Sequence, residues 1–145
     1  MTSTDTLPGA SQPFDGLITE AAQVLRPHRV GDRLIGNVAC VLVSSTGQHF
    51  HGVCIDTGSG TGFCAEHAAI AAMVTAGQFS IQSIVAVWRN EESGELFVLP
   101  PCGRCREFIR QIDPVNLHTQ VILGRSEALT LSELLPRWAW PEALR

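Results

Sequence analysis

The stretch Leu99-Pro-Pro-Cys-Gly-Arg-Cys-Arg-Glu-Phe-Ile109 places two cysteines, Cys102 and Cys105, three positions apart directly after a Pro-Pro pair. We expect a helix over residues 103–112 that stops before Pro114, because the residue preceding a proline disfavours the helical conformation. A C-x-x-C pair at a helix start is found in redox dithiols, in structural zinc sites and in catalytic zinc sites. The rest of the chain decides between these three uses.

A third cysteine, Cys64, stands in a similar setting, after a glycine-rich loop and at the first turn of a second expected helix. The 37 residues between Cys64 and Cys102 leave room for a helix, two strands and their turns, so two helix N-termini can meet at one metal ion. The positive end of a helix dipole favours thiolate over thiol, and zinc binds thiolates. Structural zinc sites use four protein ligands, whereas catalytic sites use three and leave one position open.

Glu66 follows Cys64 by two residues and favours the catalytic kind of site. A carboxylate at that place can lie beside the metal without binding it, take a proton from water and pass it to a leaving group. Positioned acid–base catalysis of this kind contributes about 10²–10⁴-fold to a rate. A structural zinc site has no use for this carboxylate. The pattern therefore predicts Cys64, Cys102 and Cys105 as zinc ligands and Glu66 as the catalytic residue.

Length and composition limit the classes of protein to be considered. The chain has 145 residues, 45% of them hydrophobic and 17% charged, which fits one globular domain. The net charge of −4 argues against nucleic acid as a partner. All ten basic residues are arginine, so Schiff-base and P-loop lysine chemistry are excluded. We expect no membrane span, since no apolar run approaches the roughly 18 residues that one requires.

The cysteine count and the N-terminal residues suggest where the protein works. Five cysteines are an odd number, and residues 1–13 show neither a basic segment nor an apolar stretch of a secretory signal. We therefore expect a reduced, cytoplasmic protein. Residues 1–13 are expected to be a loose tail, and residues 14–145 a single domain.

Hydrophobic periodicity and turn residues predict an alternation of helices and strands. Helices are expected over residues 14–25, 64–77, 103–112 and 131–135, the last opened by a capping box from Thr130 to Glu133. Strands are expected over residues 38–43, 50–55, 83–88, 96–99 and 120–123. This order is typical of an α/β domain with one sheet layered by helices.

Cys64-Ala65-Glu66 followed by Pro101-Cys102-Gly103-Arg104-Cys105 resembles the signature of zinc-dependent deaminases. Over about residues 38–136 the sequence resembles the small cytidine deaminases, and PCGRCR together with ELLP is similar to their blasticidin-S deaminase branch. The resemblance implies a three-layer α/β/α sandwich around a mixed five-stranded sheet, with one zinc ion per subunit of a homotetramer. It also implies hydrolytic loss of the C4 amino group from a free cytosine nucleoside or nucleoside analogue.

The same resemblance suggests which residues contact substrate. Cys54 and Asp56 fall where cytidine deaminases have G-x-N-x-E, whose Asn and Glu recognise ribose; because cysteine is a poor hydrogen-bond partner, ordinary cytidine is expected to be a poor substrate. Phe63 and Ala65 flank Cys64 and are expected at the substrate. The C-terminal aromatics often close over the pyrimidine, so Trp138, or Trp140, is a candidate lid.

Three thiolates on Zn²⁺ carry a net charge of −1, which makes bound water less acidic unless neighbouring groups offset that charge. Arg104, between the two ligating cysteines, is expected to donate to their sulfurs, and His67 is a second candidate.

Three alternatives stay open. The chain could deaminate another aminated heterocycle, or it could be a non-enzymatic structural zinc domain, although that interpretation lacks a fourth ligand and leaves Glu66 unused. A deaminase of polynucleotides is disfavoured by the acidic balance.

Overall fold

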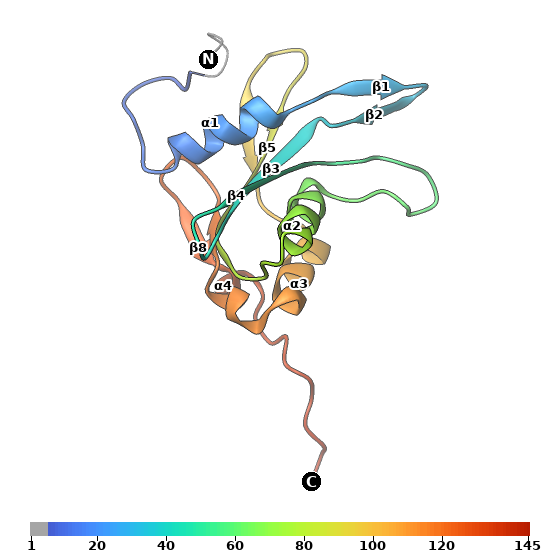
Figure 1. Cartoon of the computed structure of the whole chain (residues 1–145), viewed down its shortest axis with the longest axis vertical. Coiled ribbons are helices and arrows are strands. Elements are labelled where there is room, and N and C mark those ends of the chain that lie inside the picture. Colours follow the sequence, from blue (N-terminus) through green and yellow to red (C-terminus); the bar gives the residue numbers. More distant parts are fainter. Residues whose placement is uncertain (1–5) are drawn as a thin grey trace.

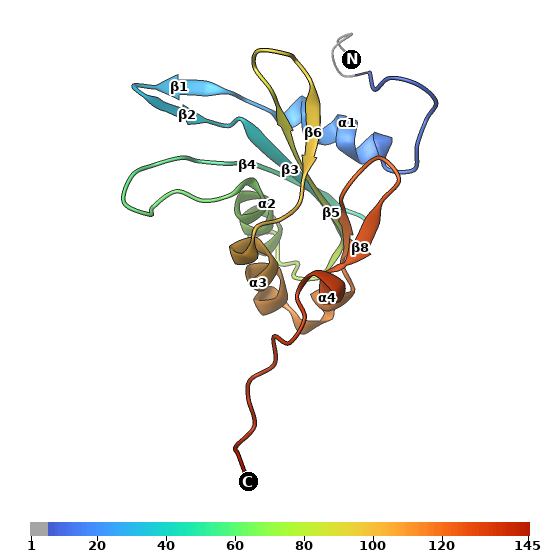
Figure 2. The same cartoon turned by 180° about the vertical axis from the view of Figure 1, so that it is seen from behind.

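The computed structural model describes residues 6–145 and shows one mixed sheet with helices on both faces (Figures 1 and 2). Its strands are β3 (Val38–Ser44), β4 (His49–Val53), β5 (Ile81–Arg89), β6 (Leu96–Leu99), β7 (Gln120–Ile122) and β8 (Ala128–Thr130). The order across the sheet is β4-β3-β5-β7-β8, and β6 pairs with the far end of β5. Among the described strand pairs of this sheet, only β5–β7 is parallel.

Helices cover the two faces of this sheet unequally. Helix α1 (Asp15–Val24) lies on one face, while α2 (Ala65–Thr75), α3 (Gly103–Ile112) and α4 (Leu131–Leu134) lie on the other (Figure 1). A short 3₁₀ helix (Pro114–His118) links α3 to β7. The predicted three-layer α/β/α sandwich is confirmed.

Alternation along the central strands divides the core into two halves. In β3, Cys40 and Leu42 are buried beneath α2 and α3, whereas Ala39 and Val41 are buried beneath α1. Successive side chains of a strand point to opposite faces of the sheet. The sequence of a strand that is buried on both faces is therefore a continuous apolar run. Burial on both faces is why β3 and β5 carry few polar residues.

The predicted strand number of five is wrong, because the described main sheet has six strands. The addition is β8, three residues that pair with β7 directly before the capping box of α4. A separate hairpin of β1 (His28–Val30) and β2 (Arg33–Ile35) was also not predicted. Both segments are short and lack an alternating apolar pattern, so periodicity offers no signal for them.

Helix α2 is held against the sheet by an unusually close contact with strand β4. A Cβ atom on Gly52 would lie 2.3 Å from the backbone nitrogen of Ala69 and 2.7 Å from the carbonyl oxygen of Ala65. Only glycine allows the helix backbone to approach the strand this closely. Gly52 thereby positions the first turn of α2, which carries Cys64 and Glu66.

The two ends of the described chain behave differently. Arg125 donates hydrogen bonds to the carbonyl oxygens of Pro8 and Ala10, so part of the expected loose tail is fixed to the domain, while residues 1–5 lie outside the described residues. The C-terminal residues after α4 run away from the body of the molecule (Figures 1 and 2). None of the described helices is long and apolar enough to cross a membrane.

Candidate metal and catalytic centre

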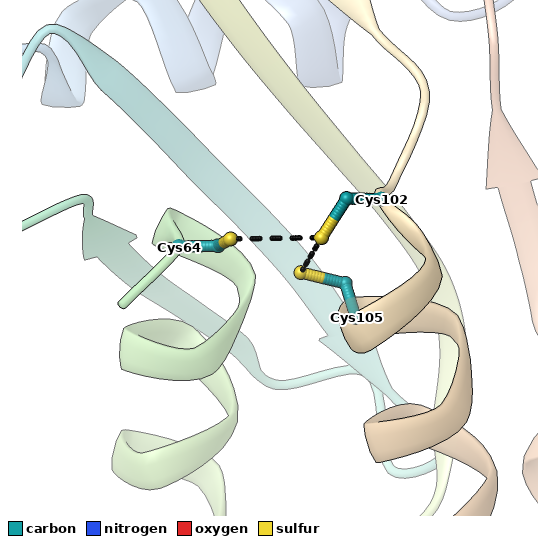
Figure 3. Close-up of side chains that lie close together, drawn as sticks. All are labelled: Cys64, Cys102 and Cys105. Atoms are coloured by element: carbon teal, nitrogen blue, oxygen red, sulfur yellow. Dashed lines mark hydrogen bonds between the residues drawn. The ribbon is translucent and has the colours of Figure 1, made fainter. Parts of the chain in front are cut away.

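Two helix N-termini bring the three predicted cysteines together, as Figure 3 shows. Cys64 is the N-cap of α2 and Cys102 the N-cap of α3, with Cys105 in the first turn of α3. The Cys102 Sγ lies 3.7 Å from the Cys64 Sγ and 3.6 Å from the Cys105 Sγ. These sulfurs converge from segments 38 residues apart in the sequence.

The spacing of the sulfurs fits a zinc ion. Tetrahedral ligands at a Zn–S distance of about 2.3 Å lie about 3.8 Å from one another. The two separations that involve Cys102 are 3.7 and 3.6 Å, and all three sulfurs lie within 4.8 Å of one another. No described histidine or carboxylate joins this group, so the donor set is three thiolates with one position left open.

The thiol groups differ in how easily they ionise. Burial opposes ionisation of Cys102, but hydrogen bonds from the backbone and from the neighbouring cysteines lower its pKa overall. Burial and the nearby Glu66 carboxylate instead raise the pKa of Cys105, and burial raises the pKa of Cys64. Cys102 is therefore the cysteine whose thiolate form, the form that binds metal ions, is most favoured.

Glu66 lies inside the site, as its spacing from Cys64 predicts. Its side chain is buried, and the Cys105 thiol donates to its Oε2 over 2.8 Å. Burial raises the pKa of Glu66. A carboxyl group in this environment is well suited to exchange protons, because desolvation brings its pKa closer to neutrality.

His67 lies next to the metal-binding group. Its Nδ1 is 3.5 Å from the Cys105 Sγ, and its ring stacks on Phe108 of α3 with centroids 4.3 Å apart. Burial and the charge of Arg104 lower the pKa of His67, so its imidazole is neutral at pH 7. A neutral imidazole can donate one hydrogen bond to a thiolate.

Arg104 occupies a different place from the one expected. No hydrogen bond joins its guanidinium to a cysteine sulfur within residues 6–145. It instead lines the cleft beside Cys64. His67 is thus the closer of the two candidate donors to a ligand sulfur, and the assignment of Arg104 stays a prediction.

An open cleft of about 340 Å³ lies directly beside Cys64. Its walls include four of the predicted residues besides Cys64, namely Cys54, Asp56, Phe63 and Arg104. The glycine-rich loop after β4 closes one side, since Thr57, Gly60 and Gly62 also line it. A ligand in this cleft would lie beside Cys64 and contact residues expected to bind substrate.

Comparison with known proteins agrees with this geometry. The profile described as "Cytidine and deoxycytidylate deaminase zinc-binding region" matches residues 17–120, which include all three cysteines and Glu66. The chain belongs to this deaminase family. It is also 32% identical over 104 residues to a blasticidin-S deaminase of Bacillus cereus, a match that covers 69% of this chain and 74% of the relative.

Solved cytidine deaminases share the fold. The enzyme from Mycobacterium tuberculosis superposes with a TM-score of 0.68 and 23% identity, over 86% of this chain and 94% of that one. The enzyme from Burkholderia pseudomallei gives 0.67 and 24%, over 84% and 95% of the two chains. Membership of the deaminase family and the spacing of the sulfurs together identify Cys64, Cys102 and Cys105 as the site of one zinc ion per subunit.

Ala65 and the two C-terminal tryptophans do not line this cleft in the single deaminase chain. Ala65 is fully buried beneath the sheet, and it is not among the residues that line the cleft. The guanidinium carbon of Arg110 in α3 lies over the Trp138 ring, 4.9 Å from the ring centroid. Trp140 is 91% exposed. In the single chain, therefore, neither tryptophan covers the cleft.

One partner of a cleft residue was not predicted from the sequence. Asn37 precedes β3, and its Oδ1 accepts a hydrogen bond from the Cys54 thiol over 3.2 Å. The two residues become neighbours only through the pairing of β3 with β4, where the Cys54 backbone N–H donates to the Val38 carbonyl oxygen. No local pattern links positions 17 residues apart, so the sequence offers no signal for this contact.

Proposed function

We propose that this protein is a zinc-dependent hydrolytic deaminase that converts the C4 amino group of a free cytosine nucleoside or nucleoside analogue to a carbonyl, releasing ammonia. The observation that carries the proposal is the position of Glu66, a buried carboxyl whose Oε2 accepts the thiol proton of the zinc ligand Cys105 at 2.8 Å. A purely structural metal site has no use for a carboxylate held this way.

Zinc bound at the three cysteines supplies Lewis-acid activation of the attacking water. The chain's own contribution is proton transfer. When Cys105 loses its proton to bind metal, Glu66 Oε2 is released from its present partner and is free to accept a proton from water. Glu66 passes this proton to the ring nitrogen beside C4 as the water oxygen bonds to C4. Glu66 then takes the second proton from the new C4 hydroxyl and gives it to the amino nitrogen. The C4–N bond breaks, ammonia leaves, C4 becomes a carbonyl, and Glu66 is again a carboxylate.

The cleft beside the zinc site supports a substrate other than plain cytidine. Cys54 already donates its thiol proton to Asn37, which leaves it a weak partner for a sugar hydroxyl. Asp56 and Arg104 add one negative and one positive group to the same cleft. An analogue that carries polar or charged substituents in place of a simple ribose suits these walls, and the Bacillus cereus relative is named for such a compound, blasticidin S.

A homotetramer is part of the same proposal. Helix α2 leaves Ala71 and Ala72 exposed, and Ala76 at its C-cap is exposed as well. The C-terminal segment exposes Trp140 and Leu144 almost completely. Packing against neighbouring subunits would cover these apolar groups and could bring Trp138 or Trp140 over a cleft. All five cysteines are free thiols, which supports the proposal that the protein is located in the reducing cytoplasm.

The test is ammonia release by the zinc-loaded protein from cytidine, deoxycytidine, cytosine and blasticidin S, with Glu66→Gln as the background. Release from any of the four that disappears in Glu66→Gln supports the proposal, and the preferred compound identifies the substrate class. Turnover of blasticidin S alone indicates antibiotic inactivation, whereas rapid turnover of cytidine indicates pyrimidine salvage. Zinc-loaded protein that releases no ammonia from any of them contradicts the proposed substrate class.

A further inference from the structure

Three hydrogen-bonded side chains of types that can bind metal ions lie on the face of the sheet opposite the cysteine site. Glu20 projects from α1, and His49 and His51 project from the edge strand β4. The His51 Nε2 lies 2.8 Å from Glu20 Oε2, and the His49 Nδ1 lies 2.9 Å from each carboxylate oxygen. Both imidazoles, from one strand, thus contact the same carboxylate of α1.

We propose that Glu20, His49 and His51 form a second binding site, for a divalent transition-metal ion such as Zn²⁺. Imidazole and carboxylate together suit zinc, copper and nickel, whereas magnesium and calcium prefer sites built from oxygen alone. One carboxylate and two neutral imidazoles would leave a net charge of +1 on the site. The donor chemistry differs from the three thiolates of the deaminase centre.

The backbone already places the two histidines correctly for this role. Residues two apart on a strand share a face, and His51 stands opposite Val41 of β3, which is buried beneath α1. His49 and His51 therefore both face α1. The helix is fixed there by Ile18 and Ala21, which are buried against the sheet on either side of Glu20. Side-chain rotation alone is needed to adjust the three ligands.

A rotation of the histidine side chains separates this arrangement from a shared cation. Neighbouring ligands of one metal ion, each about 2.1 Å from it, lie about 3.0–3.4 Å apart. Each imidazole nitrogen lies 2.8–2.9 Å from a carboxylate oxygen, but the three ligand atoms do not all lie within 4.8 Å of one another, so the two imidazoles must rotate toward each other to share an ion. The ligand atoms are reachable, since the side chains of His49 and His51 are 41% and 48% exposed.

Surrounding charges also favour a cation. Hydrogen bonds from His51 and His49 outweigh the effect of partial burial and lower the pKa of Glu20, so its carboxylate stays ionised. A cleft of about 480 Å³ opens beside Glu20 and His51 and leaves coordination positions open to solvent. Arg26 lines this cleft, but its guanidinium donates to the carbonyl oxygens of Gln23 and Leu25.

The experiment titrates Zn²⁺ into protein whose cysteine site is already filled, and counts bound zinc per chain by calorimetry and metal analysis. Wild-type protein is expected to bind a second equivalent, and the double variant His49→Gln/His51→Gln to bind none beyond the first. His118→Gln, which changes an exposed histidine of the 3₁₀ helix, is the matched control and should keep both equivalents.

A second measurement separates loss of the site from loss of the fold. Added zinc should raise the Tm of wild type and of His118→Gln, but not that of the double variant, whose Tm without added zinc should equal that of wild type. A wild-type protein that takes up only one zinc, or a double variant that still takes up two, would overturn the proposal. Neither readout depends on deamination, so this test stands apart from that of the proposed function.

Discussion

Three thiols that lie within 4.8 Å of one another at the edge of an apolar core cannot all ionise unless a cation shares the site. Burial contributes most to the raised pKa values of Cys64 and Cys105, whereas hydrogen bonds from Cys105, Cys64 and the Arg104 backbone outweigh burial and lower the pKa of Cys102. Bound zinc allows all three to ionise, because a coordinating thiol is deprotonated outright. Binding of the metal and stability of the fold are therefore linked at this site.

The first prediction concerns one of these ligands. Cys102→Ala should lose zinc and, with it, the stabilisation that zinc provides, which is about 2.7 kcal/mol at a free zinc concentration 100 times the Kd. The measurement is zinc content together with the free energy of urea unfolding, with and without added zinc. Cys54→Ala is the control, since Cys54 lies outside the sulfur cluster and should keep the metal. Full zinc content in Cys102→Ala would refute the ligand assignment.

The zinc ligands and Glu66 could be predicted from the sequence because the chemistry requires those residue types at short, fixed spacings. Cys102 and Cys105 lie one helical turn apart, and Glu66 shares the first turn of α2 with its ligand. Contacts that depend on tertiary structure could not be found in the same way. The stacking of His67 on Phe108 and the hydrogen bond from Cys54 to Asn37 both join residues from separate elements.

At the scale of elements, the site depends on how α2 and α3 are held against the sheet. Helix α2 approaches β4 through Gly52, and a reversed turn ends the helix, where Gly77 has a φ of +80°. The Gly77 and Gln78 N–H groups donate to the carbonyl oxygens of Val74 and Met73, the arrangement expected after the last turn of a helix. These contacts fix α2 at both ends.

The second prediction tests the contact at Gly52. Gly52→Ala places a methyl group 2.3 Å from the Ala69 nitrogen, so α2 must move away from β4. We expect a loss of about 1–3 kcal/mol in the free energy of unfolding, as for overpacked cores. Zinc affinity should also fall, because α2 carries Cys64; competition with a chelator measures it. Gly16→Ala, where a Cβ meets nothing within 4 Å, should leave zinc affinity unchanged. Unchanged stability and affinity in Gly52→Ala would contradict the packing described.

The third prediction concerns the ion pair that fixes α1. The Arg125 guanidinium donates to the Asp15 carboxylate at 2.8 and 2.9 Å and holds the pKa of Asp15 at about 2. Because this pKa is lower in the folded than in the unfolded chain, the stabilisation is present above about pH 4 and is lost as pH falls toward 2. The difference in unfolding free energy between wild type and Asp15→Asn should shrink over that range.

The same pH series with Arg125→Met provides the comparison, since removing either partner should abolish the same pH dependence. A difference between wild type and Asp15→Asn that does not change with pH would show that the ion pair contributes nothing through Asp15 ionisation.

Much of the element order could be predicted, because the buried helices and strands carry strong periodicity and clear end signals. The boundaries of β6 and α3 and the capping box of α4 agree with the sequence expectation. The hairpin of β1 and β2 was not predicted because each strand has only three residues, none of them buried, and β8 because three residues are too few for a pattern. Their pairing is set by neighbouring elements rather than by their own composition.

At the scale of the whole molecule, the two faces of the sheet have separate roles. The face under α2 and α3 carries the zinc site, while the face under α1 carries the proposed second metal site of Glu20, His49 and His51. The two sites are separated by the full thickness of the sheet. Changes in one group of ligands are therefore expected to leave the other intact.

The fourth prediction is the assembly state. Because a single chain leaves the outer face of α2 and the C-terminal tryptophans exposed, light scattering should give four times the mass of one chain. Ala72→Glu, which places a charge on the exposed face of α2, should lower this mass. A wild-type protein that stays monomeric at high concentration would contradict the proposed tetramer.

The measurement that tests the central claim most directly compares wild type with Glu66→Gln, with zinc content and ammonia release determined on the same samples. The central claim is that the three cysteines hold zinc and Glu66 moves the protons. Glu66→Gln should then retain one zinc per chain and a wild-type fold, while ammonia release falls by about 10²–10⁴-fold. A Glu66→Gln protein that binds zinc and still deaminates at the wild-type rate would contradict it.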